Sequence, residues 1–207
     1  MERIELALNH AGLGPVAGVD EAGRGACAGP VTVAACILPR GPVEELKGLT
    51  DSKKLTPKRR EALFDVLREV AVAYHIVHFS PQDVDRRGIS AINLEGMRQA
   101  VFGLSPSPGY VLTDAWHVPG LATEHLPVIG GDANCLCIAA ASVLAKVSRD
   151  RLMAQMDQLY PQYGFAGHKG YGTVKHMDAV RRHGASPIHR YTYRNVATAH
   201  AEWAESQ

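Results

Sequence analysis

Short runs rich in β-branched residues alternate along this chain with longer stretches of helical periodicity, and this alternation constrains the fold most strongly. The predicted strands are Val16–Asp20, Val31–Leu38, Val72–Phe79, Tyr110–Asp114 and Leu126–Ile129. The predicted helices span 56–70, 80–102 with a break near Gly88, 138–160, and 173–183 with Gly184 as the cap. We expect the first two strands, joined by a glycine-rich connection, to pair antiparallel. The interleaved order predicts an α/β domain with helices packed on a central sheet.

Composition narrows the class of protein further. The chain has 207 residues, of which 46% are hydrophobic and 21% charged, so disordered, collagen-like and coiled-coil classes are excluded. Its longest apolar runs fall far short of the roughly 18 residues that cross a bilayer. Acidic residues in Met1–Glu5 argue against a signal peptide, so we expect a cytoplasmic protein without membrane contact. We expect one domain over 1–207, with a core at about 16–160 and a C-terminal extension at 161–207.

The four cysteines form no C-x-x-C pair, which favours reduced core thiols over a structural zinc site.

Positive charge is concentrated in two parts of the chain. Residues 47–60 carry six Lys or Arg against one acid, and 165–194 carry six against one, with four histidines and three tyrosines interleaved. Basic stretches with aromatic residues favour a polyanionic partner such as nucleic acid. Two solvated helix faces would show the same charge, so charge alone leaves both interpretations open.

Four carboxylates lie where a predicted strand becomes a loop: Asp20, Glu21, Asp114 and Asp132. Carboxylates that converge at strand ends need cations to stay ionised, and oxygen ligands favour two Mg²⁺ or Mn²⁺ ions over zinc. Acids that cap helices or face solvent are the alternative for any one of them. Because neighbouring strand residues point to opposite faces, we expect the strand to end or bulge at Asp20 and Glu21.

Gly23 and Gly25 make such a break plausible and leave the Gly23–Gly25 backbone open to a sugar or phosphate. The glycine spacing does not match a dinucleotide-binding loop, because Gly29 comes one residue late and a strand follows instead of a helix.

Several motifs together resemble bacterial ribonuclease HII, in the order of that family and from about Gly18 to Tyr193. They are Gly18-Val-Asp-Glu-Ala-Gly-Arg-Gly25, Asp51-Ser-Lys-Lys-Leu55, Gly131-Asp-Ala133, Ile138-Ala-Ala-Ala-Ser-Val-Leu-Ala-Lys-Val147 and His168-Lys-Gly-Tyr-Gly-Thr173. The resemblance implies a ribonuclease H-like fold, a central mixed β-sheet flanked by helices with a small C-terminal helical extension. It implies hydrolysis of RNA in RNA–DNA hybrids and cleavage 5′ to single ribonucleotides in duplex DNA, leaving a 3′-hydroxyl and a 5′-phosphate.

The resemblance also implies roles for single residues. The four metal-binding and catalytic carboxylates would be Asp20, Glu21, Asp114 and Asp132, with Asp20 bridging two Mn²⁺ or Mg²⁺ ions. The ribose 2′-hydroxyl would be sensed by Gly23, Arg24, Gly25 and Tyr171. The substrate backbone would be contacted by Lys53, Lys54, Lys169 and Arg190, and also approached by Ser142 and Lys146. The alternatives without a functional role are a core position for Tyr171, a solvated side chain for Lys54 and a packing role for Ser142.

The chain departs from the family pattern at Gly130, where relatives commonly carry Lys, and we expect weaker substrate binding or an altered salt dependence. Tyr191 and Tyr193 replace the more usual Arg and Phe, and we expect little effect from either. A hybrid-binding protein with weakened catalysis is the alternative function, while a small-molecule phosphatase would leave the basic stretches and Tyr171 unexplained. We expect a monomer without a small-molecule cofactor.

Overall fold

A computed structural model describes residues 3–207, so Met1 and Glu2 lie outside the described chain. These residues form two compact units that interleave along the sequence. The first unit contains the chain up to Ala22, Thr32–Val77 and Asn93–Val147, and the second contains Gly23–Val31, His78–Ile92 and Ser148–Gln207. The last of these divisions falls between Val147 and Ser148. The single domain over 1–207 stays a prediction.

The first unit is organised around a mixed sheet of five strands in the order β3-β2-β1-β4-β5. The strands are β1 (Val16–Ala22), β2 (Val31–Ile37), β3 (Ala73–Phe79), β4 (Tyr110–Asp114) and β5 (His125–Val128). Strand β1 pairs antiparallel with β2 and parallel with β4, and β4 pairs parallel with β5. These pairings confirm the predicted mixed sheet and the antiparallel first pair.

Most predicted helices are present within a few residues of the expected ends. The helices are α1 (Arg3–His10), α2 (Pro57–Val70), α3 (Pro81–Arg87), α4 (Ile89–Phe102), α5 (Gly131–Asn134), α6 (Leu136–Leu159), α7 (Phe165–His168), α8 (Val174–His183) and α9 (Arg194–Glu205), with short 3₁₀ turns η1 (Glu44–Leu46) and η2 (Pro161–Tyr163). The sequence did not predict α1, α5, α7 or α9 as separate helices. No helix of the described chain has the length and apolar character needed to span a membrane.

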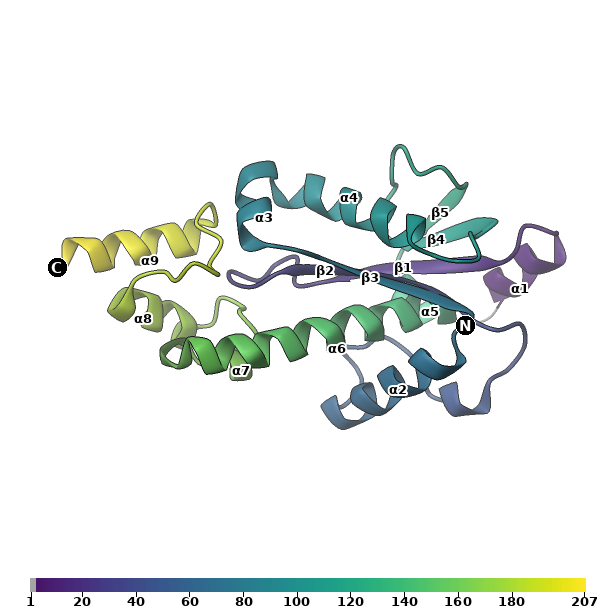
Figure 1. The fold of residues 1–207 in the computed structure, drawn as a ribbon, viewed down its shortest axis with the longest axis horizontal. Coiled ribbons are helices and arrows are strands. Elements are labelled where there is room, and N and C mark those ends of the chain that lie inside the picture. The colour runs from purple at the N-terminus through teal and green to yellow at the C-terminus, as the bar shows by residue number, and fades with distance from the viewer. Residues whose placement is uncertain (1–2) are drawn as a thin grey trace. The chain divides into compact units, whose positions relative to one another are not determined.

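Helices α2 and α6 cover one side of the sheet, and α4 lies on the other side (Figure 1). Thr56 begins α2 by accepting a hydrogen bond from the Arg59 backbone N–H, and Pro57 occupies the first turn, as predicted. The apolar face of α2, including Leu63 and Leu67, packs with the alanine-rich start of α6. At Gly18 a Cβ would collide with the backbone of Cys137, so glycine is required where α6 approaches β1.

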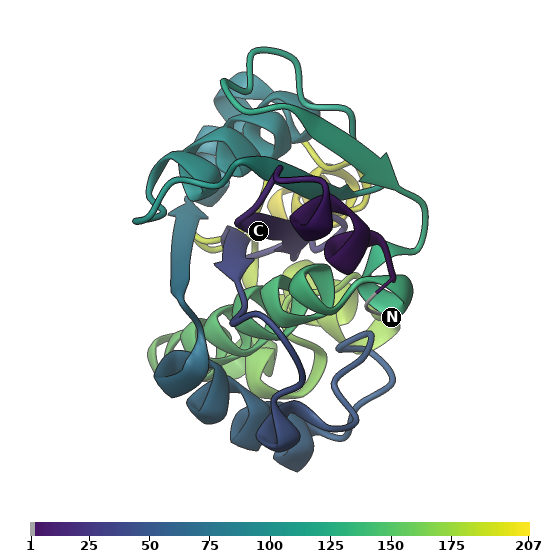
Figure 2. The ribbon, with the colours of Figure 1, turned by 90° about the vertical axis from the view of Figure 1, so that its right-hand side faces the viewer.

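Helix α1 packs at the end of the sheet that Figure 2 turns toward the viewer. Its residues Ile4 and Leu8 contact a buried cluster that contains Cys135 and Cys137. All four cysteines are buried and free, which confirms the predicted reduced thiols. Burial raises the pKa of Cys137, so this thiol stays neutral.

The second unit is built on the C-terminal half of α6 and on α7, α8 and α9. Its core contains Met153, Tyr163, Phe165, Val180 and Val196 among its buried residues. Thr173 begins α8 by accepting from the His176 backbone N–H, and Gly184 ends the helix with a positive φ of 73°, as the sequence predicts.

Candidate functional site

Three aspartates from separate elements of the first unit meet at the carboxyl ends of two parallel strands. Val19 of β1 pairs with Thr113 of β4, so the next residues, Asp20 and Asp114, emerge side by side. Asp132 reaches the same place from α5, and ligand oxygens of the three side chains lie within 4.8 Å of one another. Asp114 is the last residue of β4, as the sequence predicts, whereas Asp20 lies inside β1 and Asp132 lies in α5. The metal-binding role of the three residues stays a prediction.

The turn before Asp132 is held against the end of β4. Gly130 has φ 62° and ψ 36°, and the next backbone N–H, that of Gly131, donates to Asp114 Oδ1 at 2.8 Å. This hydrogen bond fixes the start of α5 beside Asp114. A Cβ at Gly130 would meet only Asn134, at 3.6 Å, so there is space for a side chain but the backbone conformation disfavours one.

Burial and mutual repulsion disfavour the ionised form of the three clustered aspartates when no cation is bound. Asp20 is 4% exposed, and burial followed by the charges of Glu21 and Asp114 raises its pKa well above the ordinary value. Burial and Asp114 also raise the pKa of Asp132. A divalent cation with oxygen ligands would relieve this repulsion, so the donor set fits Mg²⁺ or Mn²⁺.

Glu21 is placed differently from the sequence expectation. Strand β1 continues without a break through Ala22, with Asp20 opposite Ala34 and Glu21 opposite Val33. The expected end or bulge at Asp20 and Glu21 is therefore wrong, because the ladder stays regular and the turn begins only at Gly23. Within the described residues, the metal-competent group of three aspartates does not include Glu21. Its charge nevertheless contributes to the pKa of Asp20, and its role as a ligand stays a prediction.

Two buried serines form a hydrogen-bonded pair next to Asp20. Ser142 of α6 hydrogen-bonds Asp20, and its Oγ lies 2.8 Å from Ser52 Oγ. Ser142 is only 3% exposed, so the structure places it against a carboxylate instead of at the surface that a substrate backbone would touch. Sequence reasoning missed Ser52, although it lies inside the Asp51–Leu55 motif.

The lysines of the first unit differ in their surroundings. Lys53 Nζ lies 3.7 Å from Asp132 Oδ2, and the charges of Asp20 and Asp132 outweigh partial burial and raise its pKa. Lys54 is exposed, and Lys146 is half-buried on α6. The structure therefore brings Lys53 into an ion pair with the aspartate cluster.

In the second unit, Arg190 is fully buried and holds the loop that contains Arg24. Its guanidinium donates to the carbonyl oxygens of Arg24, at 2.9 Å, and Gly29, at 3.0 Å. The Tyr193 hydroxyl also donates to the Arg24 carbonyl, at 2.8 Å, and lies 3.0 Å from Arg190 Nη1. These contacts give Arg190 a positioning role in place of direct phosphate contact, and they give the Tyr193 hydroxyl a part that sequence reasoning did not expect.

Arg149 is a second buried arginine, and no sequence pattern predicted its position. It donates to the carbonyl oxygens of Pro30 and Lys169, both at 2.9 Å, and of Ala28, at 3.0 Å. Burial lowers its pKa to about 10, so it remains charged at pH 7. A Cβ at Gly23 would collide with the Arg149 side chain, which explains the glycine at that position.

Tyr171 follows a sharp turn in which Lys169 has φ 52° and Gly170 has φ 81°. The tyrosine side chain is 39% exposed, and its ring centroid lies 5.6 Å from the Arg149 guanidinium carbon. The exposed ring does not fit the alternative of a core tyrosine. Arg24 and Gly25 are exposed, whereas Lys169 is half-buried.

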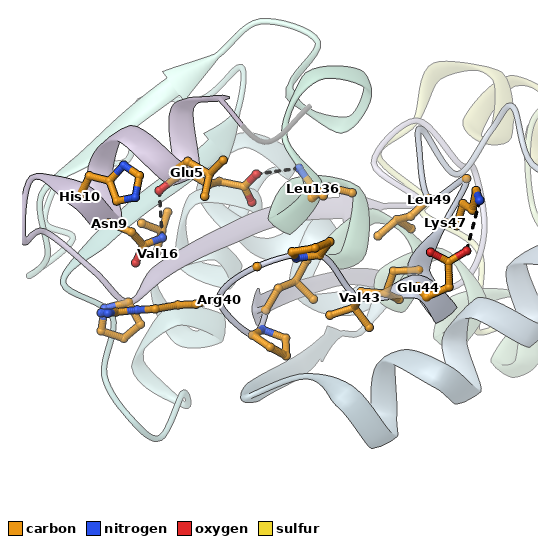
Figure 3. Close-up of a pocket in the computed structure, with 18 residues that line it drawn as sticks. Glu5, Asn9, His10, Val16, Arg40, Val43, Glu44, Lys47, Leu49 and Leu136 are labelled. Atoms are coloured by element: carbon orange, nitrogen blue, oxygen red, sulfur yellow. Dashed lines mark hydrogen bonds and ion pairs between the residues drawn. The ribbon is translucent and has the colours of Figure 1, made fainter.

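A hollow of about 1110 Å³ lies elsewhere in the first unit, lined by α1, the start of β1 and the segment 38–49 that contains η1 (Figure 3). None of the predicted site residues is among those that line it. Glu5 borders the hollow, and its carboxylate accepts from the backbone N–H groups of Leu136, at 3.1 Å, and Cys137, at 2.6 Å. Glu5 thus caps the start of α6, which is a structural role.

Comparison with known proteins agrees with the motif pattern. The profile of the ribonuclease HII family matches residues 17–196. Ribonuclease HII of Corynebacterium efficiens is 61% identical over 202 residues, which cover 98% of this chain and 87% of that protein. A crystal structure of ribonuclease H2 from Pyrococcus horikoshii superposes with a TM-score of 0.79 at 28% identity, covering 92% of this chain and 99% of that one.

A crystal structure of Bst-RNase HIII in complex with Mn²⁺ shares the fold, with a TM-score of 0.67 at 16% identity over 92% of this chain and 70% of that one. The mixed sheet flanked by helices is therefore a ribonuclease H-like fold. From the family profile and the high identity over nearly its whole length, this chain belongs to the ribonuclease HII family, whose members are endonucleases that act on RNA–DNA hybrids.

Proposed function

We propose that this protein hydrolyses the RNA strand of RNA–DNA hybrids and cuts duplex DNA on the 5′ side of single ribonucleotides. The observation that carries the proposal is the convergence of Asp20, Asp114 and Asp132 in a member of the ribonuclease HII family. Glu21 completes the proposed carboxylate set. The biological role that follows is removal of ribonucleotides misincorporated into DNA.

The chemistry is proposed to depend on two divalent ions, Mg²⁺ or Mn²⁺. When bound, such ions activate a water for attack on phosphorus and neutralise the charge that develops on the leaving 3′-oxygen. Asp20 is suited to hold them because the Glu21 backbone N–H, at 2.7 Å, and Ser142 orient its carboxylate. Lys53 places a positive charge beside Asp132, where a substrate phosphate would be attracted.

Substrate recognition is proposed to use residues besides the aspartate cluster. The Gly23–Gly25 backbone and the hydroxyl of the exposed residue Tyr171 would sense the ribose 2′-hydroxyl, which is both a donor and an acceptor. Lys54, Lys146 and Lys169 would contribute phosphate affinity without sequence preference. The protein is proposed to be cytoplasmic and monomeric. Sedimentation would test the oligomeric state.

Cleavage of three matched duplexes tests the proposal. The substrates are a long RNA–DNA hybrid, a DNA duplex with one ribonucleotide and an all-DNA duplex, each with Mg²⁺ or Mn²⁺ and then with excess chelator. We expect metal-dependent cleavage of the first two and none of the third. Tight hybrid binding without cleavage would instead support the hybrid-binding alternative, in which Gly130 weakens catalysis.

A further inference from the structure

The second unit contains two buried histidines that the proposed chemistry does not use. His176 and His189 are 0% and 1% exposed, and their Nε2 atoms lie 3.0 Å apart. His176 Nδ1 lies 2.9 Å from the carbonyl oxygen of Tyr171. The pair therefore connects the core of the unit directly to the backbone of the exposed tyrosine.

Hydrogen bonds run in series from the Ser186 backbone through His189 and His176 to the Tyr171 carbonyl. The direction of each one follows from the groups at the two ends of this series. A carbonyl oxygen only accepts, so His176 Nδ1 carries a proton and donates to Tyr171. A backbone N–H only donates, and that of Ser186 lies 2.9 Å from His189 Nδ1, so this nitrogen accepts. With both rings neutral, His189 Nε2 carries its proton and donates to the lone pair of His176 Nε2. The 2.9 Å contact with Ser186 N–H decides the tautomer over the longer approach of 3.3 Å to the Ser186 carbonyl.

The surroundings keep both rings neutral. A further proton on His176 would place two N–H groups face to face across the 3.0 Å contact with His189, and a further proton on His189 Nδ1 would face the Ser186 N–H across 2.9 Å. Phe165 packs edge-on against His176 at a centroid distance of 5.4 Å, and His168 stacks on it at 4.4 Å. Burial lowers the pKa of His176 to about 4 and of His189 to about 3.

The Tyr171 carbonyl is the point where this chain of hydrogen bonds ends. It accepts from the Thr173 backbone N–H at 2.8 Å as well as from His176. On the other side of the turn, the Gly170 carbonyl accepts from the backbone N–H groups of Cys27, at 2.8 Å, and Ala28, at 3.2 Å. The peptide units on both sides of Tyr171 are thus held, while its ring stays exposed.

We propose that His176 and His189 are positioning residues that hold the Tyr171 backbone through a chain of hydrogen bonds with fixed direction, and so determine how well the protein distinguishes a ribonucleotide from a deoxyribonucleotide. This inference rests on the proposed function of Tyr171 as a sensor of the 2′-hydroxyl. The histidines touch no substrate and act through the tyrosine.

Nitrogen-15 NMR of the histidine rings tests the hydrogen-bond chain without any activity measurement. At pH 7 we expect His176 as the Nδ1–H tautomer and His189 as the Nε2–H tautomer, both neutral. The opposite tautomer on either ring, or a charged ring, would overturn the proposal.

Paired substitutions test the effect on discrimination. His176→Asn keeps an amide N–H near the position of Nδ1, whereas His176→Leu removes the donor. The readout is the ratio of Kd values for an all-DNA duplex and the same duplex with one ribonucleotide, with Ca²⁺ as the bound ion. We expect His176→Leu to reduce this ratio about fivefold to tenfold, the effect of one hydrogen bond, and His176→Asn to recover most of it.

His200→Asn is the matched control, because His200 also accepts from a backbone N–H, that of Ala185 at 3.1 Å, but lies outside the series of hydrogen bonds that runs from Ser186 through His189 and His176 to Tyr171. An unchanged ratio in a folded His176→Leu protein overturns the proposal, as does an equal loss in His200→Asn. If His176→Leu does not fold, His189→Leu against His189→Gln makes the same comparison one link further along.

Tyr171→Phe separates this proposal from the proposed function beneath it. A lower ratio in Tyr171→Phe with no change in His176→Leu overturns only the positioning role. No change in Tyr171→Phe overturns the sensor itself, and with it the positioning role. If the sensor role of Tyr171 and the positioning role of His176 are both correct, the two residues act in series. Adding His176→Leu to Tyr171→Phe should then reduce the ratio of Kd values little further.

Discussion

At the scale of single residues, the properties of Asp20 follow from its neighbours. It is buried, accepts from the Glu21 backbone N–H and Ser142, and lies against two further aspartates. Asp20→Asn keeps the volume but removes one ligand charge, so we expect at least a 100-fold loss of cleavage, on the order of 3 kcal/mol. Cleavage rates should be compared with those of Glu205→Gln, an exposed carboxylate at the end of α9.

The Asp20→Asn protein should also unfold at the same temperature as the parent or higher, because like-charge repulsion in a buried cluster is reduced. Retained turnover would show that Asp20 has been assigned wrongly. A loss of activity together with a loss of folding would leave Asp114 and Asp132 as the residues to substitute next.

Tyr193 is a residue whose contribution only the structure reveals. Its hydroxyl joins the Arg24 carbonyl to buried Arg190. We expect Tyr193→Phe to lower the free energy of unfolding by about 1 kcal/mol, the typical net contribution of such a hydrogen bond. Denaturant unfolding measures the loss, with Tyr191→Phe as a comparison, since the Tyr191 hydroxyl donates to the Ala185 carbonyl in an exposed position. Equal stability of Tyr193→Phe and the parent would contradict the holding role of the hydroxyl.

Predictability at this scale depended on local signals. Asp20 and Asp114 could be singled out because each lies at or near the end of a strand that the sequence predicts. Arg149 could not, because its partners Ala28 and Pro30 lie 121 and 119 residues away in sequence. Ser52 and Ser142 meet across 90 residues for the same reason. Contacts between distant segments carry no sequence period that would predict them.

At the scale of elements, strong periodicity and end signals predicted α2, α6 and α8. Helix α9 was missed because most of its apolar residues are small alanines, which give a weak helical pattern, and its stability comes from packing Val196 and Ala199 into the core of the second unit. Helix α1 has only 8 residues, too few for stability in isolation. The regular course of β1 through Glu21 was also missed, because Gly23 and Gly25 favoured an earlier break.

The turn that begins α5 offers a prediction about salt dependence. Gly130→Lys adds a positive charge one residue before Gly131, whose N–H holds Asp114. We expect a lower KM at low salt and a slope of log KM against log salt that is steeper by about one. The positive φ of 62° should cost about 1 kcal/mol in the free energy of unfolding. If KM and the salt slope both stay unchanged, the proposed effect of the missing lysine is wrong.

The histidine pair that links α8 to the loop before Tyr191 predicts how stability depends on pH. The folded-state pKa values of His176 and His189, about 4 and about 3, lie below the ordinary value of 6.5. Between each folded-state pKa and 6.5, the unfolded chain therefore binds more protons than the folded protein. The free energy of unfolding falls as pH drops below about 6.5, by up to about 1.4 kcal/mol per pH unit for each ring.

Denaturant unfolding at pH 7, 6 and 5 measures this loss. Since carboxylates also titrate at acid pH, the difference between the parent and His176→Asn isolates one ring, and the variant should lose less stability over this range. Parallel pH profiles for the two proteins would contradict buried neutral histidines.

At the scale of the whole molecule, the residues proposed to function in catalysis and recognition divide between two compact units. The three aspartates, Lys53 and Ser142 belong to the first unit, while the Gly23–Gly25 loop, Arg190 and Tyr171 belong to the second. Each set is held by contacts within its own unit. The motif order could be recognised from the sequence, but this division of the residues between units became visible only in the structure.

Mapping both product ends of a DNA duplex that contains one ribonucleotide tests the central claim most directly. The duplex, labelled at each end in turn, is incubated with Mn²⁺ or Mg²⁺, and a parallel reaction contains excess chelator. We predict a single cut on the 5′ side of the ribonucleotide, with a 3′-hydroxyl and a 5′-phosphate, and none with chelator. Cleavage that persists without metal, or a cut at another position, would contradict the account.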